Sequence, residues 1–307
     1  MIDPPVPFSA IHKARSSQQY LTVCACLQAL ILGLILFAAL VPSSNANSSQ
    51  TFVHGAVQQA GFMDFESDGE ISGFKHALVG ELARRLNWQD AHQKCPFQRC
   101  LFSMANGSLD MMVFVSATQE RFDYLDFIQV WPSTRKIPFY VRDGEQKRLT
   151  RYDDLSGLRI GVVNGYAYFP RFDKDNSLKK ITVTTERQLT HMLQANRIDT
   201  YIAFDAIHFD QHSERKKVVK APFEKTVESS ALIAISKKSP LENILPQIER
   251  EIISMIDDGS LMDLWSRSFP HKQFPYPLQA YPKHTLDRPS SNAHSLEQRL
   301  RNVSGKK

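Results

Sequence analysis

The chain of 307 residues lacks the short motifs that mark many catalytic sites. Its ten histidines show no HExxH spacing, and neither a Gly-rich phosphate loop nor a GxSxG nucleophile motif is present. No internal repeat is visible. The sequence therefore gives no support to a zinc protease, a nucleotide-phosphate site or a serine hydrolase, and we expect neither a catalytic residue nor a cofactor.

The folded part of the chain also lacks an excess of positive charge. The formal net charge is +5, but residues 271–307 contain seven Lys or Arg residues against two acidic ones. Residues 1–46 add +1, which leaves about −1 for the middle of the chain. This balance gives no electrostatic reason to expect nucleic-acid binding. The proline-rich segment 271–307 is predicted to be a basic, disordered tail.

An apolar run near the N-terminus predicts export. Two basic residues precede the segment 21–41, which is almost continuously apolar, and Ser-Asn-Ala at 44–46 fits a small-x-small cleavage site. We expect residues 1–46 to be a signal peptide that is removed after Ala46. The competing interpretation is an uncleaved membrane anchor, because the run approaches bilayer-spanning length. In both cases the domain that follows lies in the periplasm.

Cysteine is scarce, and two of the four cysteines fall within the export segment. The other two, Cys95 and Cys100, would face a non-reducing compartment after export. Their short spacing, with Pro96 between them, permits a local disulfide, while a free buried pair is the alternative. A zinc site is not expected, because the mature chain has no matching second pair of cysteines, and we predict no metal site.

Strand and helix patterns alternate after the export segment. Residues 51–57 have a strand pattern, and 73–88 repeat Phe or Leu every four residues, as in an amphipathic helix. A second helix is expected at 97–106, closed by Asn-Gly, and apolar strands at 111–115 and 158–163 continue the alternation. Such alternation predicts βαβ units in a mostly parallel sheet.

Two such series suggest two lobes joined by two crossings, near 138–142 and near 227–231. The predicted division is 47–140 for the first part of lobe 1, 141–227 for lobe 2 and 228–270 for a segment that returns to lobe 1. Ligands of α/β folds bind at the carboxyl ends of strands, which here would lie between the lobes.

One stretch combines features of an anion site. The apolar run at 111–115 is followed by Ser116, and Thr118 could cap a helix that has Arg121 in its first turn. Backbone N–H groups, a hydroxyl group and a guanidinium would then converge on one point, where a carboxylate could bind bidentately to the arginine. The alternative is a surface arginine paired with a neighbouring acidic residue.

Several segments, taken together, resemble the bacterial periplasmic solute-binding proteins of family 3, the polar amino-acid type. They are residues 69–86, 106–112, 116–121, 155–163 and 196–199. In this order and spacing they form a specific set that covers about residues 51–269. The resemblance implies an α/β, two-lobed Venus-flytrap fold of type II with two crossover strands, and it implies ligand binding without catalysis.

Matched residue by residue, the resemblance makes Arg121 the clamp of the ligand α-carboxylate, with Ser116 beside it. Phe62 and Phe97 match positions where aromatic rings line the ligand, although Phe62 could equally be a core residue. Asp205 lies near the acidic residue that binds the α-ammonium, one residue later than the usual spacing. This departure favours a small carboxylate over a free α-amino acid.

The leading hypothesis is a periplasmic protein that captures a small, carboxylate-bearing, amino-acid-like solute for an inner-membrane ABC transporter or a sensor. One alternative is a periplasmic enzyme on the same fold, similar to the cyclohexadienyl dehydratases. That enzyme would need a general acid or base in the cleft, for which Glu224 and Asp205 are candidates. Another alternative is a membrane-anchored interaction protein, if residues 21–41 are retained.

Overall fold

The computed structural model describes residues 50–204 and 217–274. The predicted export segment, Asp205 and most of the predicted tail lie outside the described residues. The described helices and strands all belong to one compact unit of the chain. Within the described ranges, no helix has both the length and the apolar character needed to cross a membrane.

An eight-stranded sheet organises this unit, with the strand order β4-β1-β5-β10-β6-β9-β7-β8. Its strands are β1 (Thr51–Ala56), β4 (Gln89–Lys94), β5 (Met111–Val113), β6 (Leu125–Arg142), β7 (Arg159–Val163), β8 (Lys179–Val183), β9 (Thr200–Ile202) and β10 (Val218–Ser236). A separate small ladder pairs β2 (Asp64–Phe65) with β3 (Ile71–Ser72).

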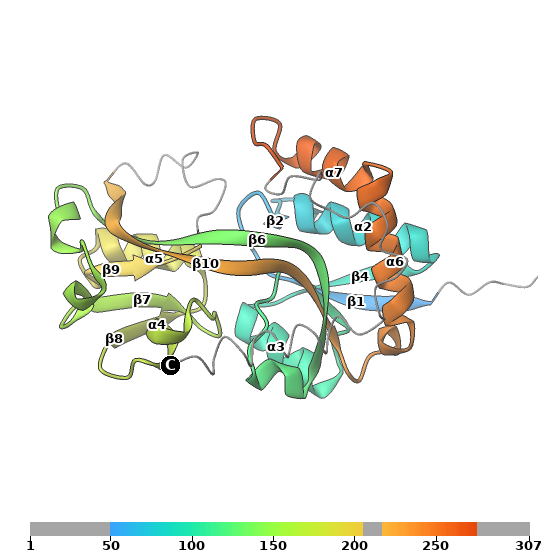
Figure 1. The fold of residues 1–307 in the computed structure, drawn as a ribbon, viewed down its shortest axis with the longest axis horizontal. Coiled ribbons are helices and arrows are strands. Elements are labelled where there is room, and N and C mark those ends of the chain that lie inside the picture. Colours follow the sequence, from blue (N-terminus) through green and yellow to red (C-terminus); the bar gives the residue numbers. More distant parts are fainter. Residues whose placement is uncertain (1–49, 205–216, 275–307) are drawn as a thin grey trace, which may run out of the picture. The chain divides into compact units, whose positions relative to one another are not determined.

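The long strands β6 and β10 run side by side and connect the two halves of the sheet (Figure 1). The prediction of a mostly parallel sheet is wrong for this central part. Strand β1 pairs in parallel with β4 and β5, as does β7 with β8 and β9, but the contacts of β10 with β5 and of β6 with β10 and β9 are antiparallel. The reason is that the chain passes between the halves twice, in opposite directions.

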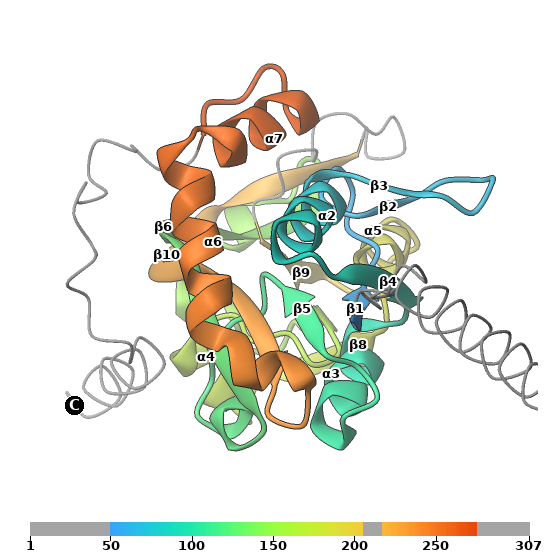
Figure 2. The same ribbon diagram turned by 90° about the vertical axis from the view of Figure 1, so that its right-hand side faces the viewer.

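The two helices predicted at 73–88 and 97–106 are present as α2 (Phe74–Leu86) and α3 (Phe97–Asn106). The other described helices are α4 (Pro170–Lys174), α5 (Glu186–Gln194), α6 (Leu245–Asp257) and α7 (Ser260–Ser268), with short 3-10 turns η1 (Glu120–Asp123), η2 (Gln146–Arg148), η3 (Tyr152–Leu155) and η5 (Pro240–Ile244). Gly107 ends α3 with a φ of 85°, a left-handed conformation that glycine adopts without strain. Helices α2, α6 and α7 pack against one another (Figure 2).

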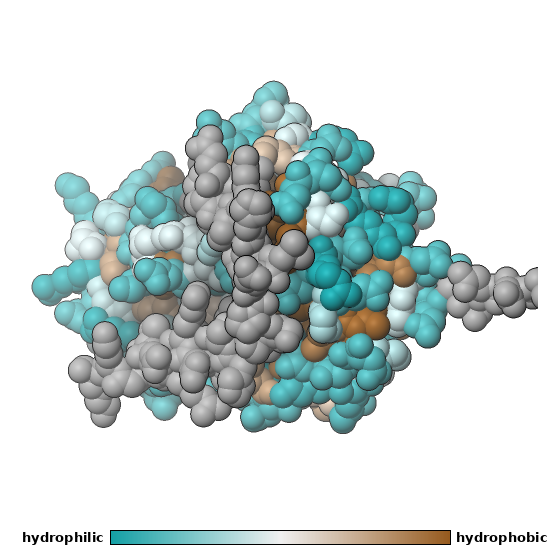
Figure 3. Space-filling model, turned by 45° about the vertical axis from the view of Figure 1, so that its right-hand side comes forward, coloured by the Kyte–Doolittle hydropathy of each residue, from teal (hydrophilic) through white to brown (hydrophobic). Residues whose placement is uncertain are grey.

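Each half of the sheet has its own buried core. In the half that contains β1, β4 and β5, Trp265 packs against Phe74 and Phe269, with ring centroids 5.2 Å and 4.5 Å apart. In the half that contains β7, β8 and β9, Phe139 and Phe172 lie 5.8 Å apart. The face drawn in Figure 3 is largely hydrophilic, with hydrophobic residues in small patches. Each core therefore stabilises its own half. Loops, strand ends and the middle of β6 and β10 are left to line the space between the halves.

The disulfide prediction is confirmed. Cys95 and Cys100 are bonded, with their Cα atoms 5.6 Å apart. Cys95 follows β4, and Cys100 lies in α3, so the bond fixes the start of α3 to the end of the edge strand. This start is where Phe97 lies.

Candidate functional site

A cavity of about 360 Å³ opens between the two halves of the sheet. Its described lining comes from the loop after β1, the starts of α2 and α3, the turn after β5, the middle of β6 and β10, and the segment after β7. The volume lies in the range of small-molecule sites. Both halves contribute side chains, so a bound ligand would contact both.

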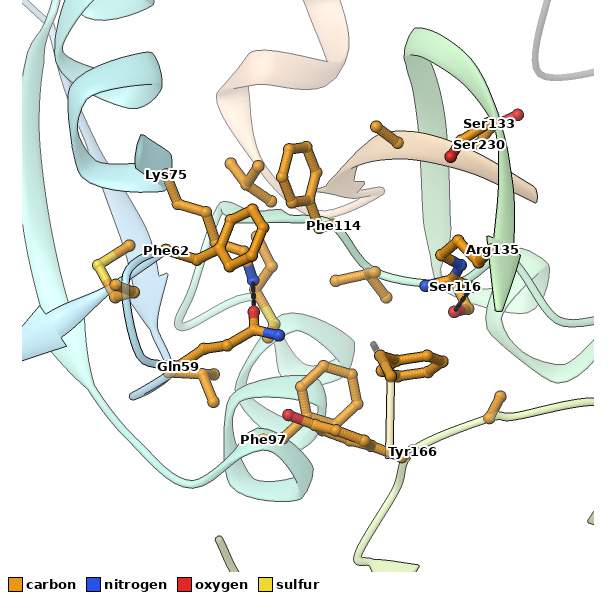
Figure 4. A pocket seen from close by; sticks show the side chains of 18 of the residues that line it. Gln59, Phe62, Lys75, Phe97, Phe114, Ser116, Ser133, Arg135, Tyr166 and Ser230 are labelled. Atoms are coloured by element: carbon orange, nitrogen blue, oxygen red, sulfur yellow. Dashed lines mark hydrogen bonds between the residues drawn. The ribbon is translucent and has the colours of Figure 1, made fainter. Parts of the chain in front are cut away.

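Four of the five residues predicted to bind a ligand line this cavity. They are Phe62, Phe97, Ser116 and Arg121. The first three are labelled in Figure 4. The fifth, Asp205, lies outside the described residues. The structure thus brings the predicted residues to one place, while their role in binding remains a prediction.

The stretch around Arg121 folds differently from the expectation. Strand β5 ends at Val113, and Arg121 lies in the single 3-10 turn η1 rather than in an α-helix capped by the Thr118 side chain. Thr118 acts through its main chain instead, because its carbonyl oxygen accepts hydrogen bonds from the N–H groups of Arg121 (3.0 Å) and Phe122 (3.3 Å). The main-chain N–H groups of Arg121 and Phe122 are thus used within the turn, and the guanidinium of Arg121 offers the donors at this place.

Arg121 is only 5% exposed and links the two halves. Its Nη1 donates to the carbonyl oxygen of Ser116 at 2.6 Å, and its Nη2 donates to that of Gly165, in the segment after β7. The guanidinium carbon lies 5.5 Å from the centre of the Phe97 ring. Burial lowers the pKa of Arg121, but a guanidinium keeps its charge in proteins.

A second arginine, Arg135 in β6, lies beside it and was missed in the sequence. Its Nη2 donates to the hydroxyl oxygen of Ser116 at 3.2 Å, and its guanidinium carbon lies 4.5 Å from the ring centre of Phe204. The buried Nε has no hydrogen-bond partner among the described residues. Burial lowers the pKa of Arg135 to about 10. We call Ser116, Arg121, Arg135 and Phe204 the guanidinium end of the pocket.

The other charged part of the pocket, which we call the amine end, consists of Gln59, Phe62, Lys75 and Phe114. The Nζ atom of Lys75 donates to Oε1 of Gln59 at 2.7 Å and lies 5.9 Å and 5.4 Å from the ring centres of Phe62 and Phe114 (Figure 4). Lys75 is 8% exposed. Burial lowers its pKa to about 8, with a raising effect of Glu186 and a lowering effect of Arg135.

Two aromatic residues of the amine end also have structural roles. The ring of Phe62 lies 5.1 Å from that of Phe269, so it belongs to the core as well as to the pocket wall. Phe114 has a φ of 62°, in the left-handed region that bulky residues rarely occupy. Such strain persists only where the surroundings impose it, which is common at binding sites.

The pocket has positive charge and no described counter-charge in its wall. No Asp or Glu is among the described residues that line it. A fourth lining cation, Lys136, forms an ion pair with Glu224 at 2.8 Å, and Glu224 is not part of the lining. Glu224 is thus held by Lys136, one side chain away from the described lining of the cavity.

The fold and the pocket between the two halves agree with the protein family that the chain matches. Residues 53–271 match the model of the bacterial extracellular solute-binding proteins, family 3, and the chain belongs to this family. The family predicted from the sequence motifs is thus confirmed.

Among individual relatives, a probable histidine-binding protein of Campylobacter jejuni is 24% identical over 165 residues. The match spans 52% of this chain and 62% of that protein. The chain thus covers less than two thirds of the length of this relative.

Solved structures of the same class extend the likeness to the whole fold. An ancestral arginine-binding protein bound to arginine has a TM-score of 0.63 at 19% identity, covering 71% of this chain and 98% of its own. A mutant arginine-binding protein from T. maritima has a TM-score of 0.64 at 20% identity, and the match covers 73% of this chain and 97% of that chain. A periplasmic arginine-binding protein from Legionella pneumophila has a TM-score of 0.60 at 18% identity, covering 72% and 99%. The predicted two-lobed fold is confirmed.

Proposed function

We propose that the protein binds a small, carboxylate-bearing, amino-acid-like solute in the periplasm, without catalysis. It would pass this solute to an inner-membrane ABC permease or report it to a sensor. Membership of the solute-binding family supports the binding role, and the predicted export segment supports the compartment.

The observation that carries the proposal is the charge of the pocket. Lys75, Arg121 and Arg135 lie in its wall, and no salt bridge joins any of them to another described residue. Removing a charge from water is costly unless an opposite charge or hydrogen bonds compensate it. An anionic ligand would supply that compensation, with one carboxylate at the guanidinium end.

The amine end suggests a second anionic or polar group on the ligand. The structural relatives are named for arginine, a solute with a cationic side chain. A cationic side chain would need an acidic partner, which the described lining does not provide. We therefore propose that acidic amino acids or small dicarboxylates fit this pocket better than arginine or histidine.

A thermal-shift screen of amino acids and small mono- and dicarboxylates, followed by calorimetric titration of the hits, tests the proposal. Acidic solutes should raise the melting temperature more than arginine or histidine. Arg121→Ala should weaken binding of the best solute by about thirtyfold or more, because the carboxylate loses a charge-assisted partner in a dehydrated site at a cost of roughly 2–5 kcal/mol.

Arg84→Ala is the matched control, because Arg84 is an exposed arginine that pairs with Glu81 on the surface of α2. Its affinity should equal that of the wild type. Equal dissociation constants for the wild type and Arg121→Ala would discard the carboxylate clamp. Conversion of a prephenate-like substrate, followed by product analysis, would favour the enzyme instead.

A further inference from the structure

A second cluster of polar side chains lies on the edge strand β4 and the first turn of α2. His76, Asp90 and His92 each offer one ligand atom, and these atoms lie within 4.8 Å of one another. Nδ1 of His76 is 3.1 Å from Nε2 of His92, which is 3.6 Å from Oδ2 of Asp90. None of the three residues lines the solute pocket.

The fold brings these residues together from two elements. Asp90 and His92 are two positions apart on β4, so their side chains point to the same face of the sheet. Strand β4 pairs in register with β1, and His92 lies opposite His54. Helix α2 packs against β4 and adds His76 from its first turn. The sequence predicts no metal site here, because no short spacing joins position 76 to positions 90 and 92.

The distances from Nε2 of His92 to the other two ligand atoms suit a tetrahedral ion. Two nitrogen ligands at zinc distances of 2.0–2.1 Å and a tetrahedral angle lie about 3.3 Å apart. The observed separations of 3.1 Å and 3.6 Å lie on either side of this value. We propose that His76, Asp90 and His92 form a binding site for one divalent transition-metal ion, such as Zn²⁺, with a fourth position left for water.

The ligand types and the accessibility of the cluster fit such an ion. Two imidazole rings and one carboxylate are ligands that Zn²⁺ commonly takes in proteins. The side chains of His92 and Asp90 are 14% and 24% exposed, so that an ion can reach them from solvent.

His54 closes the inner side of the cluster. It is 1% exposed, and neither of its ring nitrogens has a hydrogen-bond partner among the described residues. Its ring lies edge-on to that of His92, with centroids 5.4 Å apart. His54 therefore forms a buried wall beside the His92 ring.

Calorimetric titration of the untagged, metal-free protein with Zn²⁺ tests the site. We expect one ion per chain, with Mg²⁺ giving no heat because this hard ion prefers oxygen ligands. His76→Gln, Asp90→Asn and His92→Gln should each weaken Zn²⁺ binding by at least about tenfold, since even the outer partners of metal ligands change affinity by 10- to 100-fold.

His271→Gln is the matched control, because His271 is an exposed histidine that does not belong to the cluster. Its Zn²⁺ affinity should equal that of the wild type. Circular dichroism melting of each variant checks the fold, and His76→Gln, on a half-buried position, should fold normally. The proposal would be overturned if the wild type bound no Zn²⁺, or if a folded His76→Gln variant bound it with the same affinity as the wild type. The contact between His76 and His92 would then be only a hydrogen bond between the two rings.

Discussion

The amine end and the guanidinium end of the pocket carry the same sign of charge under different constraints. Lys75 has a neutral oxygen partner, Gln59, and two aromatic faces, and its pKa falls to about 8. Arg135 retains a buried Nε without a described partner, and its pKa is lowered only to about 10. The amine end can therefore lose its charge above about pH 8, where the guanidinium end is still charged.

This difference suggests separate tasks for the two ends. A permanent charge with an unused donor suits a carboxylate that every ligand carries. A titratable amine among aromatic rings suits the variable part of the ligand and adds to selectivity. Changing one residue at a time should therefore separate affinity from selectivity.

The largest effects are expected at the two arginines of the guanidinium end. Like Arg121→Ala, Arg135→Ala should weaken binding of the best solute by about thirtyfold or more, because its buried Nε has no hydrogen-bond partner among the described residues and is free to bind a carboxylate. Arg135→Lys should recover only part of the loss, since an ammonium cannot reproduce the planar fork of donors. Calorimetric titration of both variants measures the effect.

Lys75→Met is the corresponding change at the amine end and should lower the affinity less. If Lys75→Met reduced the affinity more than Arg135→Ala, the assignment of the two ends would be reversed. Arg84→Ala serves again as the surface control.

The next effect is a pH dependence of stability and affinity that we expect from the titration of Lys75. Its pKa is about 8 in the folded protein against 10.5 ordinarily, so between these values the unfolded state binds more protons than the folded state. The free energy of unfolding should then rise from about pH 8 to about pH 10.5, by at most roughly 3 kcal/mol. Over the same range the affinity for a dianionic solute should fall, because the amine loses its charge. Denaturant unfolding and calorimetry at several pH values measure both.

In Lys75→Met this part of the pH dependence should disappear, and the variant should be as stable as the wild type or more stable at neutral pH. Arg135 and Glu186, which also act on the Lys75 pKa, are retained in it. An unchanged pH profile in Lys75→Met would show that another group titrates.

The smallest effect is expected from the disulfide, which holds α3 and Phe97 below the guanidinium end. Replacing Cys95 and Cys100 by serine should lower the free energy of unfolding by at most about 2 kcal/mol, because so short a loop constrains the unfolded chain little. The solute affinity should change less than in Arg135→Ala. Denaturant unfolding measures the change in stability, and calorimetry measures the change in affinity. An affinity loss as large as that of Arg135→Ala would mean that α3 positions the arginines.

Local signals in the sequence were sufficient for many elements. The repeat of apolar residues placed a helix at 73–88, and the Asn-Gly pair ended a second one at 97–106, where the structure has α2 and α3. The Cys95–Cys100 pairing could be foreseen because both cysteines are neighbours along the chain. The Ser116 and Arg121 motif was recognised, although the turn is 3-10 rather than α-helical.

Strand β6 had no such local signal. Its 18 residues include Pro132 and Pro138, with polar and charged residues between them. This pattern is typical of a loop. It forms a strand because β10 pairs with it along nearly its whole length. Arg135 therefore could not be assigned to the pocket from the sequence.

By itself the sequence determined the helices at 73–88 and 97–106, the strands that begin near residues 51, 111 and 158, the disulfide and the family, since each depends on residues that are neighbours along the chain. The tertiary structure decided which side chains meet: Arg135 with Ser116 and Phe204, Lys75 with Gln59, and His76 with Asp90 and His92. These contacts depend on strand register and on packing between distant segments, and local periodicity carries no information about either.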